Sequence, residues 1–243
     1  MYQPRTYRSW IEGGDLVTFK VVVKETDLYV RAASNLSRKV QRLVVKYRNL
    51  LERYIARHQD FLTSLEPVPV AADAPHIVKL MAEAGAKAKV GPWSAVAGAI
   101  AEFVGTDLAP LTPELIIENG GDIYLKSQKK RVVGIYAGDS PLSGKIGFEI
   151  EPGQTPIGIS TSSGMVGHSL SFGRADAVTI VADSAILSDA AATAICNLIQ
   201  QPEDISKGIE FAQKINGLRG MVIIIGETIG FYGDIKICPI SVN

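Results

Sequence analysis

The second half of this sequence contains a series of short β-strand candidates, many of them joined by tight turns, and this pattern limits the fold more than any other feature. From Leu115 onward, segments rich in Val, Ile, Phe and Tyr are separated by turn sequences such as NGGD and GDSPLSG. The segments are LIIEN, DIYLKS, RVVGIYAG, KIGFEI, PIGIST and AVTIVAD, followed near the C-terminus by GMVIIIGE and GDIKICPI. Such short turns join antiparallel strands, because a parallel connection needs a longer crossover. The sequence therefore predicts an α+β fold with largely antiparallel sheets rather than a doubly wound parallel sheet.

The N-terminal part combines a strand pair with helices. Residues 16–24 and 28–33 are rich in Val, Phe and Tyr, and the polar tetrapeptide KETD between them predicts a β-hairpin. Apolar residues at three- and four-residue spacing then predict one long helix over residues 36–65, which Pro67 and Pro69 end. Further helices are expected at residues 77–88, in GPWSAVAGAIAEFVG, around Asp189, and at residues 202–215.

The composition is that of a soluble globular protein, with 47% hydrophobic residues and a formal net charge of zero. Apolar runs such as GMVIIIG reach about a third of the length that a bilayer span needs, and the N-terminus has no apolar signal-peptide core. We therefore expect a cytoplasmic protein with no membrane segment. Residues 1–243 are expected to form one compact domain, with an internal subdivision near residue 110 as the alternative. Cys196 and Cys238 are predicted to be buried free thiols.

The outer face of the long helix, over residues 38–57, is basic. Its charged residues are Arg38, Lys39, Arg42, Lys46, Arg48, Arg53 and Arg57 against Glu52 alone. Seven positive charges and one negative charge give about plus six, so this face is either a solvated surface or a contact for an acidic protein partner. We expect no nucleic-acid partner, because no aromatic side chains are interleaved to stack on bases. The oligomeric state stays open.

The segment SDAAATAIC carries an aspartate and a threonine four residues apart in a run of alanines. On a helix, Asp189 and Thr193 lie on one face about one turn apart. A carboxylate and a hydroxyl are hard oxygen donors of the kind that Mg²⁺ prefers. The alternative is structural: Asp189 favours the positive end of its own helix, and Thr193 bonds a carbonyl one turn back.

Three further segments are candidates for ligand binding. In STSSGMVGHSLSFG, the hydroxyls and backbone N–H groups of Thr161, Ser162, Ser163 and Gly164 suit a phosphate, and His168 suits acid/base chemistry. A loop of hydroxyl-mediated turns with a structural histidine has the same composition. The other two candidates are the turn made by Asn119, Gly120, Gly121 and Asp122, which also reads as a plain hairpin turn, and the small-residue helix containing Gly98, which also reads as packing.

Taken in order, AVAGAIAE, ENGGDI, STSSG, GH and SDAAATA resemble the motifs of the ApbE family, flavin transferases that move FMN from FAD to a threonine or serine of a target protein. The sequences of the segments GPWSAVAGAIAE and TSSGMVGHSLSFG most resemble those of the short, cytoplasmic branch of this superfamily. The resemblance implies two T-fold-type units in one body. It also implies that Asp189 and Thr193 hold Mg²⁺ beside the FAD pyrophosphate, together with a backbone carbonyl from the small-residue helix.

The sequence departs from the ApbE pattern at charged positions. Ala97 stands where the family has a lysine, Ser171 where it has an aspartate, and Glu102 where it usually has an aspartate. The leading hypothesis is therefore Mg²⁺-dependent binding of FAD, FMN or a similar pyrophosphate nucleotide, with FAD cleavage or FMN transfer as the reactions that such binding would allow. The alternative is an accessory protein without flavin transfer, because this branch is associated in anaerobes with sulfide assimilation into homocysteine.

Overall fold

The computed structural model describes residues 8, 14–164 and 172–240, and its centre is an antiparallel β-sheet. Within these residues the sheet has eight strands in the order β1-β2-β3-β4-β7-β8-β9-β10, and every neighbouring pair is antiparallel. The strands are β1 (Val17–Val23), β2 (Thr26–Ala32), β3 (Leu115–Asn119), β4 (Asp122–Lys126), β7 (Ile157–Ser162), β8 (Ala177–Ala182), β9 (Leu218–Ile225) and β10 (Thr228–Gly233). The predicted α+β class with antiparallel sheets is confirmed.

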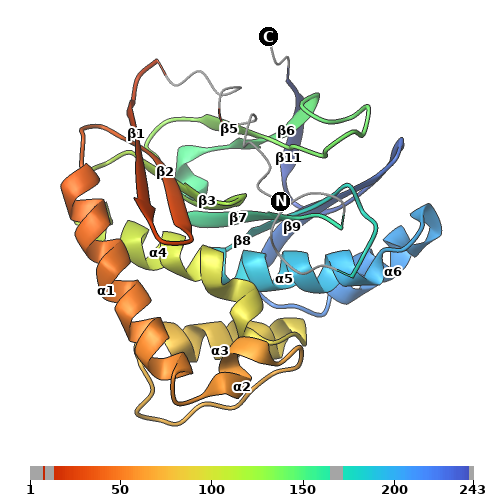
Figure 1. Cartoon of the computed structure of the whole chain (residues 1–243). Coiled ribbons are helices and arrows are strands. Elements are labelled where there is room, and N and C mark those ends of the chain that lie inside the picture. The colour runs from red at the N-terminus through yellow and green to blue at the C-terminus, as the bar shows by residue number, and fades with distance from the viewer. Residues whose placement is uncertain (1–7, 9–13, 165–171, 241–243) are drawn as a thin grey trace.

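Helices cover one face of this sheet and a small second sheet covers the other (Figure 1). The helices are α1 (Ser37–Ile55), α2 (Gln59–Thr63), α3 (His76–Ala88), α4 (Val96–Leu108), α5 (Ala185–Leu198) and α6 (Ile205–Ala212). The second sheet has the order β11-β6-β5, with β5 (Arg131–Gly134), β6 (Ile146–Ile150) and β11 (Lys236–Pro239). Two hydrophobic cores result, one under the helices and one between the sheets.

The large sheet is built from two halves with the same order of elements. In the first half, β1 and β2 are followed by α1 to α4 and then by β3 and β4; in the second, β7 and β8 are followed by α5 and α6 and then by β9 and β10. The halves join through the β4–β7 pair, in which Asp122 pairs with Ser160. Two strand-pair, helix, strand-pair units are the organisation expected for T-fold-type units. The organisation of residues 1–243 as one domain stays a prediction.

Helix α5 is buried on every side, which explains its alanines. It packs on α3, α4 and the strands β7 and β8, and Ala185, Ala190, Ala191 and Ala194 are all buried. Small side chains are the ones that let several elements approach one helix this closely. At Gly158 of β7, an added Cβ would lie only 2.2 Å from the backbone nitrogen of Ala185. The alanine run is therefore a packing feature of the helix that carries the aspartate.

The prediction of one continuous helix over residues 36–65 is wrong beyond Ile55. Helix α1 ends at Ile55, and the chain turns at residues 56–58 before the short α2. The turn directs Phe61 into the core, where its ring packs edge-on against Tyr54 at 5.2 Å and lies 6.5 Å from the ring of Trp93. Burial of this aromatic side chain outweighs continued helical periodicity, which alone cannot indicate such a turn.

Two further boundaries differ from the sequence prediction. The first hairpin has a two-residue turn at Lys24 and Glu25, because Val23 pairs with Thr26, so KETD is not a loop of four residues. Strand β10 was not predicted, since its sequence TIGFYG contains two glycines, which weaken a strand pattern. It pairs with β9 as the edge of the sheet.

Both cysteines are free, and Cys196 is buried as predicted whereas Cys238 is only partly buried. In the part of the chain that the structure describes, no helix has the length and apolarity needed to cross a bilayer.

Candidate functional site

Several of the predicted site residues meet at one end of the central strands, on the face that the helices cover. Asn119 ends β3 and pairs with Asp122, which begins β4 and pairs in turn with Ser160 of β7. Side chains alternate along a strand, so Asp122 shares a face with Tyr124, whose ring contacts Gly105 of α4. The carboxylate of Asp122 is therefore on the helix side of the sheet.

The Gly120–Gly121 turn is a tight hairpin turn that is also attached to helix α4. The φ angles of the two glycines are 72° and 107°, in the left-handed region that glycine adopts without a steric penalty. The Asn119 side-chain amide donates to the carbonyl oxygen of Ala97 at 3.0 Å. The N–H of Gly121 donates to Glu118 Oε1 at 2.8 Å, and the N–H of Thr161 donates to the Gly121 carbonyl at 3.3 Å. The segment is therefore a hairpin turn, as one of the two sequence interpretations held, and this does not conflict with the other interpretation, that it borders a ligand.

Asp189 contacts the first turn of α4 rather than the N-terminus of its own helix. Its Oδ2 accepts a hydrogen bond from the Gly98 N–H at 2.8 Å. The contact requires glycine at position 98, because an added Cβ would lie 2.2 Å from the carbonyl oxygen of Ala185. The N-terminus of α5 is capped instead by Ser184, whose Oγ accepts from the N–H groups of Ile186 and Leu187.

The capping of the two helices is reciprocal. Glu102, on α4, accepts at Oε2 from Ser184 Oγ at 2.7 Å and from the Ile186 N–H at 3.1 Å. Each helix therefore supplies a carboxylate to the N-terminal turn of the other, where the helix dipole favours negative charge. Sequence reasoning placed Glu102 only by resemblance and missed Ser184 and its capping partners. Ser184 preceding a helix was a readable cap signal, but nothing local identifies a partner 82 residues away.

The carboxyl groups of Asp122 and Asp189 form a buried pair. The two residues are only 7% and 8% exposed, and their side chains lie close enough to interact. Burial, and then the neighbouring charge of Asp122, raise the pKa of Asp189 well above its ordinary value, whereas the N–H groups of Gly98 and Ala97 act in the opposite direction. Two carboxyl groups buried side by side repel each other when both are charged, and this repulsion adds to the effect of burial.

The predicted hydroxyl residues divide between the two faces of the sheet. Ser162 is buried, and its Oγ has no hydrogen-bond partner among the described residues. Thr161 points to the opposite face, where its Oγ1 lies 3.0 Å from that of Thr179. Thr193 is buried on α5, one turn beyond Asp189. The structure thus brings Gly98, Asn119, Asp122 and Asp189 into one network of contacts and turns the Thr161 side chain away from it.

The loop after β7 is fixed at its base. The N–H of Gly164 donates to the Ala175 carbonyl at 3.0 Å, and Ser163 Oγ lies 3.5 Å from the same oxygen. Between them and Ala175 the chain runs through residues 165–171, which are outside the described residues. The predicted roles of His168 and Ser171 fall in this segment, so the acid/base role of His168 stays a prediction.

The protein oxygens at this site could bind a hard cation only if a ligand supplied further coordinating oxygens. In the described part of the chain, no group of three or more His, Cys, Asp or Glu side chains is arranged to hold a metal ion. The oxygen-bearing groups in this region are the Asp122–Asp189 carboxyl pair, the Ala97 carbonyl that accepts from Asn119, and Thr193, one turn beyond Asp189 on α5. Oxygen donors of this kind fit Mg²⁺, which commonly shares its coordination shell with substrate phosphates. The residues present therefore fit a magnesium ion that is bound together with a phosphate ligand.

The fold, with two strand-pair, helix, strand-pair halves in one sheet, is that of the ApbE proteins. The chain is similar to the flavin transferase ApbE from Vibrio cholerae, with a TM-score of 0.57 and 14% identity over 89% of this chain and 96% of that one. It is also similar to the ApbE protein from Thermotoga maritima, with a TM-score of 0.58 and 12% identity over 90% and 97% of the two chains. At these identities the likeness shows the fold alone.

The family can be stated more closely. The chain belongs to the family described as "AbpE bacteria", which matches residues 8–224. It is similar to a UPF0280 protein of Methanocaldococcus jannaschii, with 42% identity over 222 residues that cover 89% of this chain and 90% of that one. A UPF0280 protein of Methanopyrus kandleri is 43% identical over 225 residues, which cover 90% and 91% of the two chains.

Proposed function

We propose that this protein binds FAD, or a similar pyrophosphate nucleotide, together with Mg²⁺ at the Asp122–Asp189 carboxyl pair. The buried pair itself is the observation that carries the proposal. Two carboxylates removed from water cannot both be ionised without a large energetic penalty. A divalent cation beside them offsets this penalty, and when bound it would neutralise negative charge on the pyrophosphate oxygens.

The residues for each part of the site follow from their placement. Asp189 and Thr193 would hold the metal, and Asn119 with the Gly120–Gly121 turn would border the nucleotide. The phosphate would meet the end of β7, through Ser162, Ser163 and the backbone of Thr161 and Gly164. Support comes from Ser162, because a buried hydroxyl without a partner costs about 1–3 kcal/mol, which a ligand oxygen accepting its proton would offset.

Binding is better supported than flavin transfer. Ala97 lies in the first turn of α4, next to Gly98, and supplies no positive charge where the family motif has a lysine. A group that stabilises charge mainly in the transition state can be lost while ground-state binding survives. The second candidate function is therefore an accessory role in which the protein binds the nucleotide without transferring FMN.

A protein partner at α1 is a separate part of the proposal. Within the described residues, Arg38, Lys39, Arg42, Arg53 and Arg57 are exposed and form no ion pair, whereas Lys46 and Arg48 are paired with acidic side chains. The unpaired charges leave a basic surface that suits an acidic protein in the cytoplasm.

The direct test replaces Asp189 with asparagine. Asparagine can still accept the Gly98 N–H bond, and it removes the like charge beside Asp122, so the ligand-free variant should be at least as stable as the parent. The parent should bind FAD in the presence of Mg²⁺, and FAD at 100 times its Kd should add about 2.7 kcal/mol of stability. The variant should bind at least tenfold more weakly, a loss of about 1.4 kcal/mol.

Isothermal calorimetry with and without Mg²⁺ measures both affinities. Asp234→Asn is the matched control, because it makes the same chemical change at an exposed aspartate far along the chain. Equal affinity in Asp189→Asn and in the parent would exclude the metal role of Asp189. A parent protein that binds no FAD with Mg²⁺ present would exclude the proposed function.

A further inference from the structure

Arg8 connects the N-terminal part of the chain to two acidic residues beside the Gly120–Gly121 turn. Its Nε donates to Glu118 Oε2 at 2.5 Å, and its two terminal nitrogens donate to Asp27, at 3.1 Å to Oδ1 and at 2.9 Å to the carbonyl oxygen. The guanidinium also lies 5.3 Å from the ring centroid of Tyr29. The side chains of Arg8 and Glu118 are only 10% and 9% exposed. This is a mostly desolvated, multidentate contact rather than a surface ion pair.

Glu118 connects Arg8 to the Gly120–Gly121 turn, because it contacts both. One carboxylate oxygen accepts from Arg8, while the other accepts from the N–H of Gly121 at 2.8 Å. Asp27, the second partner of Arg8, directly precedes Leu28, which pairs with Asn119 across the β2–β3 ladder. Arg8 therefore holds both strands at the point where the turn begins.

The turn depends on such backbone contacts because glycines have no side chains to anchor it. Both glycines have left-handed φ angles, and glycine loses more conformational freedom on folding than any other residue. The residues on either side of the turn are Asn119, which bonds α4, and Asp122, which pairs with Asp189. A small change in the turn would therefore move both flanks of the candidate site.

We infer that Arg8 is a positioning residue: by holding Glu118 in an ion pair it fixes the Gly120–Gly121 turn, and nucleotide binding at the Asp122–Asp189 site depends on it. The inference rests on the proposed function for the identity of the ligand. Without Arg8, Glu118 would lose the guanidinium that orients its carboxylate, and the bond from the Gly121 N–H would no longer be held in place. Arg8 acts through Glu118 and the turn, so its effect on the ligand is indirect.

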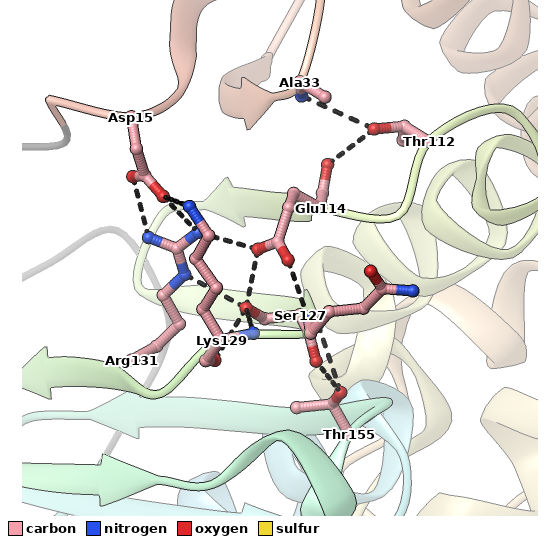
Figure 2. Close-up of polar contacts among 9 residues, drawn as sticks. Asp15, Ala33, Thr112, Glu114, Ser127, Lys129, Arg131 and Thr155 are labelled. Atoms are coloured by element: carbon pink, nitrogen blue, oxygen red, sulfur yellow. Dashed lines mark hydrogen bonds and ion pairs between the residues drawn. The ribbon is translucent and has the colours of Figure 1, made fainter.

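A second ionic contact at the opposite end of the same hairpin provides a matched control (Figure 2). Asp15, also from the N-terminal part, receives two bonds from Arg131 at 2.9 and 3.0 Å, and Arg131 donates to Glu114 at 2.7 Å. Glu114 directly precedes β3, and its carboxylate also accepts from Ser127 Oγ, which follows β4. Asp15→Asn thus weakens a multidentate arginine–carboxylate contact that is more exposed and lies a full strand length from the turn.

The experiment compares Arg8→Gln, Asp15→Asn and the parent by hydrogen exchange of the peptide covering residues 117–124, without ligand. We expect the turn amides to exchange at least tenfold faster in Arg8→Gln and within twofold of the parent in Asp15→Asn. Calorimetry with FAD and Mg²⁺ should then show at least tenfold weaker binding for Arg8→Gln alone. An unchanged exchange rate in Arg8→Gln, or the same increase in both variants, would overturn the positioning role.

Two features keep the test decisive. If Arg8→Gln does not fold, Arg8→Lys takes its place. A lysine ammonium cannot reproduce the guanidinium fork that reaches Glu118 and Asp27 together, so hydrogen exchange at the turn should still be faster than in the parent. An exchange rate equal to that of the parent would reject the inference. The exchange measurement needs no nucleotide, so it judges Arg8 even if the parent fails to bind FAD, a result that would reject the proposed function alone. Faster exchange with unchanged FAD affinity would overturn the link between Arg8 and the site.

Discussion

Replacing Gly98 with alanine should destabilise the protein, although alanine is the better helix former. An added Cβ would lie 2.2 Å from the carbonyl oxygen of Ala185, 2.8 Å from its carbonyl carbon and 2.9 Å from Asp189 Cβ. None of these atoms is the end of a flexible side chain, so the contacts can be relieved only if α4 and α5 move apart. Such a movement also lengthens the 2.8 Å hydrogen bond from the Gly98 N–H to Asp189.

The opposing contributions can be compared. Glycine to alanine in a helix interior gains about 1 kcal/mol from propensity. Overpacking of a close-packed contact costs about 1–3 kcal/mol, and the loss of a hydrogen bond to a charged acceptor costs about 1.5–3 kcal/mol. The clash and the lost bond outweigh the propensity gain, so we expect Gly98→Ala to lower the free energy of unfolding by roughly 2–4 kcal/mol.

Urea denaturation, with the free energy extrapolated linearly to water, measures this difference. The control is Gly153→Ala, because a Cβ at Gly153 meets nothing within 4 Å and its φ is not left-handed. That variant should be unchanged or stabilised by about 0.4–1 kcal/mol, as alanine restricts the unfolded chain. A Gly98→Ala protein as stable as the parent would refute the close α4–α5 contact and the placement of Asp189 that depends on it.

Two further predictions concern chemistry and pH. Incubation with FAD, Mg²⁺ and an ApbE acceptor protein should give covalent flavin labelling about 10²- to 10³-fold slower than by a flavin transferase, because Ala97 provides no charge. This rate difference corresponds to a loss of about 2.7–4 kcal/mol of transition-state stabilisation. Efficient labelling that requires Asp189, seen as fluorescence on a denaturing gel, would contradict the prediction. Burial alone would raise the pKa of Glu114. Hydrogen bonds from Ser127, Arg131 and the Gln128 N–H lower it by more than burial raises it, so the net pKa is below its ordinary value. The stabilisation by Glu114 is therefore present above the ordinary glutamate pKa and is lost as pH falls through the pKa of the folded state. In acid denaturation the parent should lose stability more steeply than Glu114→Gln. Parallel curves of stability against pH would contradict the network of Figure 2.

The antiparallel sheet could be predicted because its strands are rich in β-branched and aromatic residues and many of its turns are local. The β3–β4 hairpin is an example: LIIEN, the two glycines and the following strand lie together in sequence, and the bounds of β3 agree with the prediction. The break after Ile55 and strand β10 could not be predicted in the same way. The first depends on the burial of Phe61 against Trp93, which is distant in sequence, and the second depends on pairing with β9.

The candidate site was less predictable, because its contacts join residues that are far apart in the chain. The bond between Asp189 and Gly98 spans 91 residues. Helical spacing correctly indicated that Asp189 and Thr193 share a helix, but it could not show that the carboxylate faces α4 and pairs with Asp122. The role of Glu118 beside the turn had no sequence signal at all, since the acceptor of the Gly121 N–H is decided by the ion pair with Arg8.

The reciprocal capping gives Asp189 two roles that compete. Its Oδ2 stabilises the first turn of α4, so a cation that draws the carboxylate away would leave the Gly98 N–H without an acceptor. A phosphate at the same place would compensate, because helix N-termini bind anions through free N–H groups and the dipole. Burial and the nearby Asp122 also raise the pKa of Asp189, which opposes the binding of a cation by its carboxylate. We therefore expect Mg²⁺ without nucleotide to bind weakly and the two ligands to bind cooperatively, since each relieves the cost that the other creates.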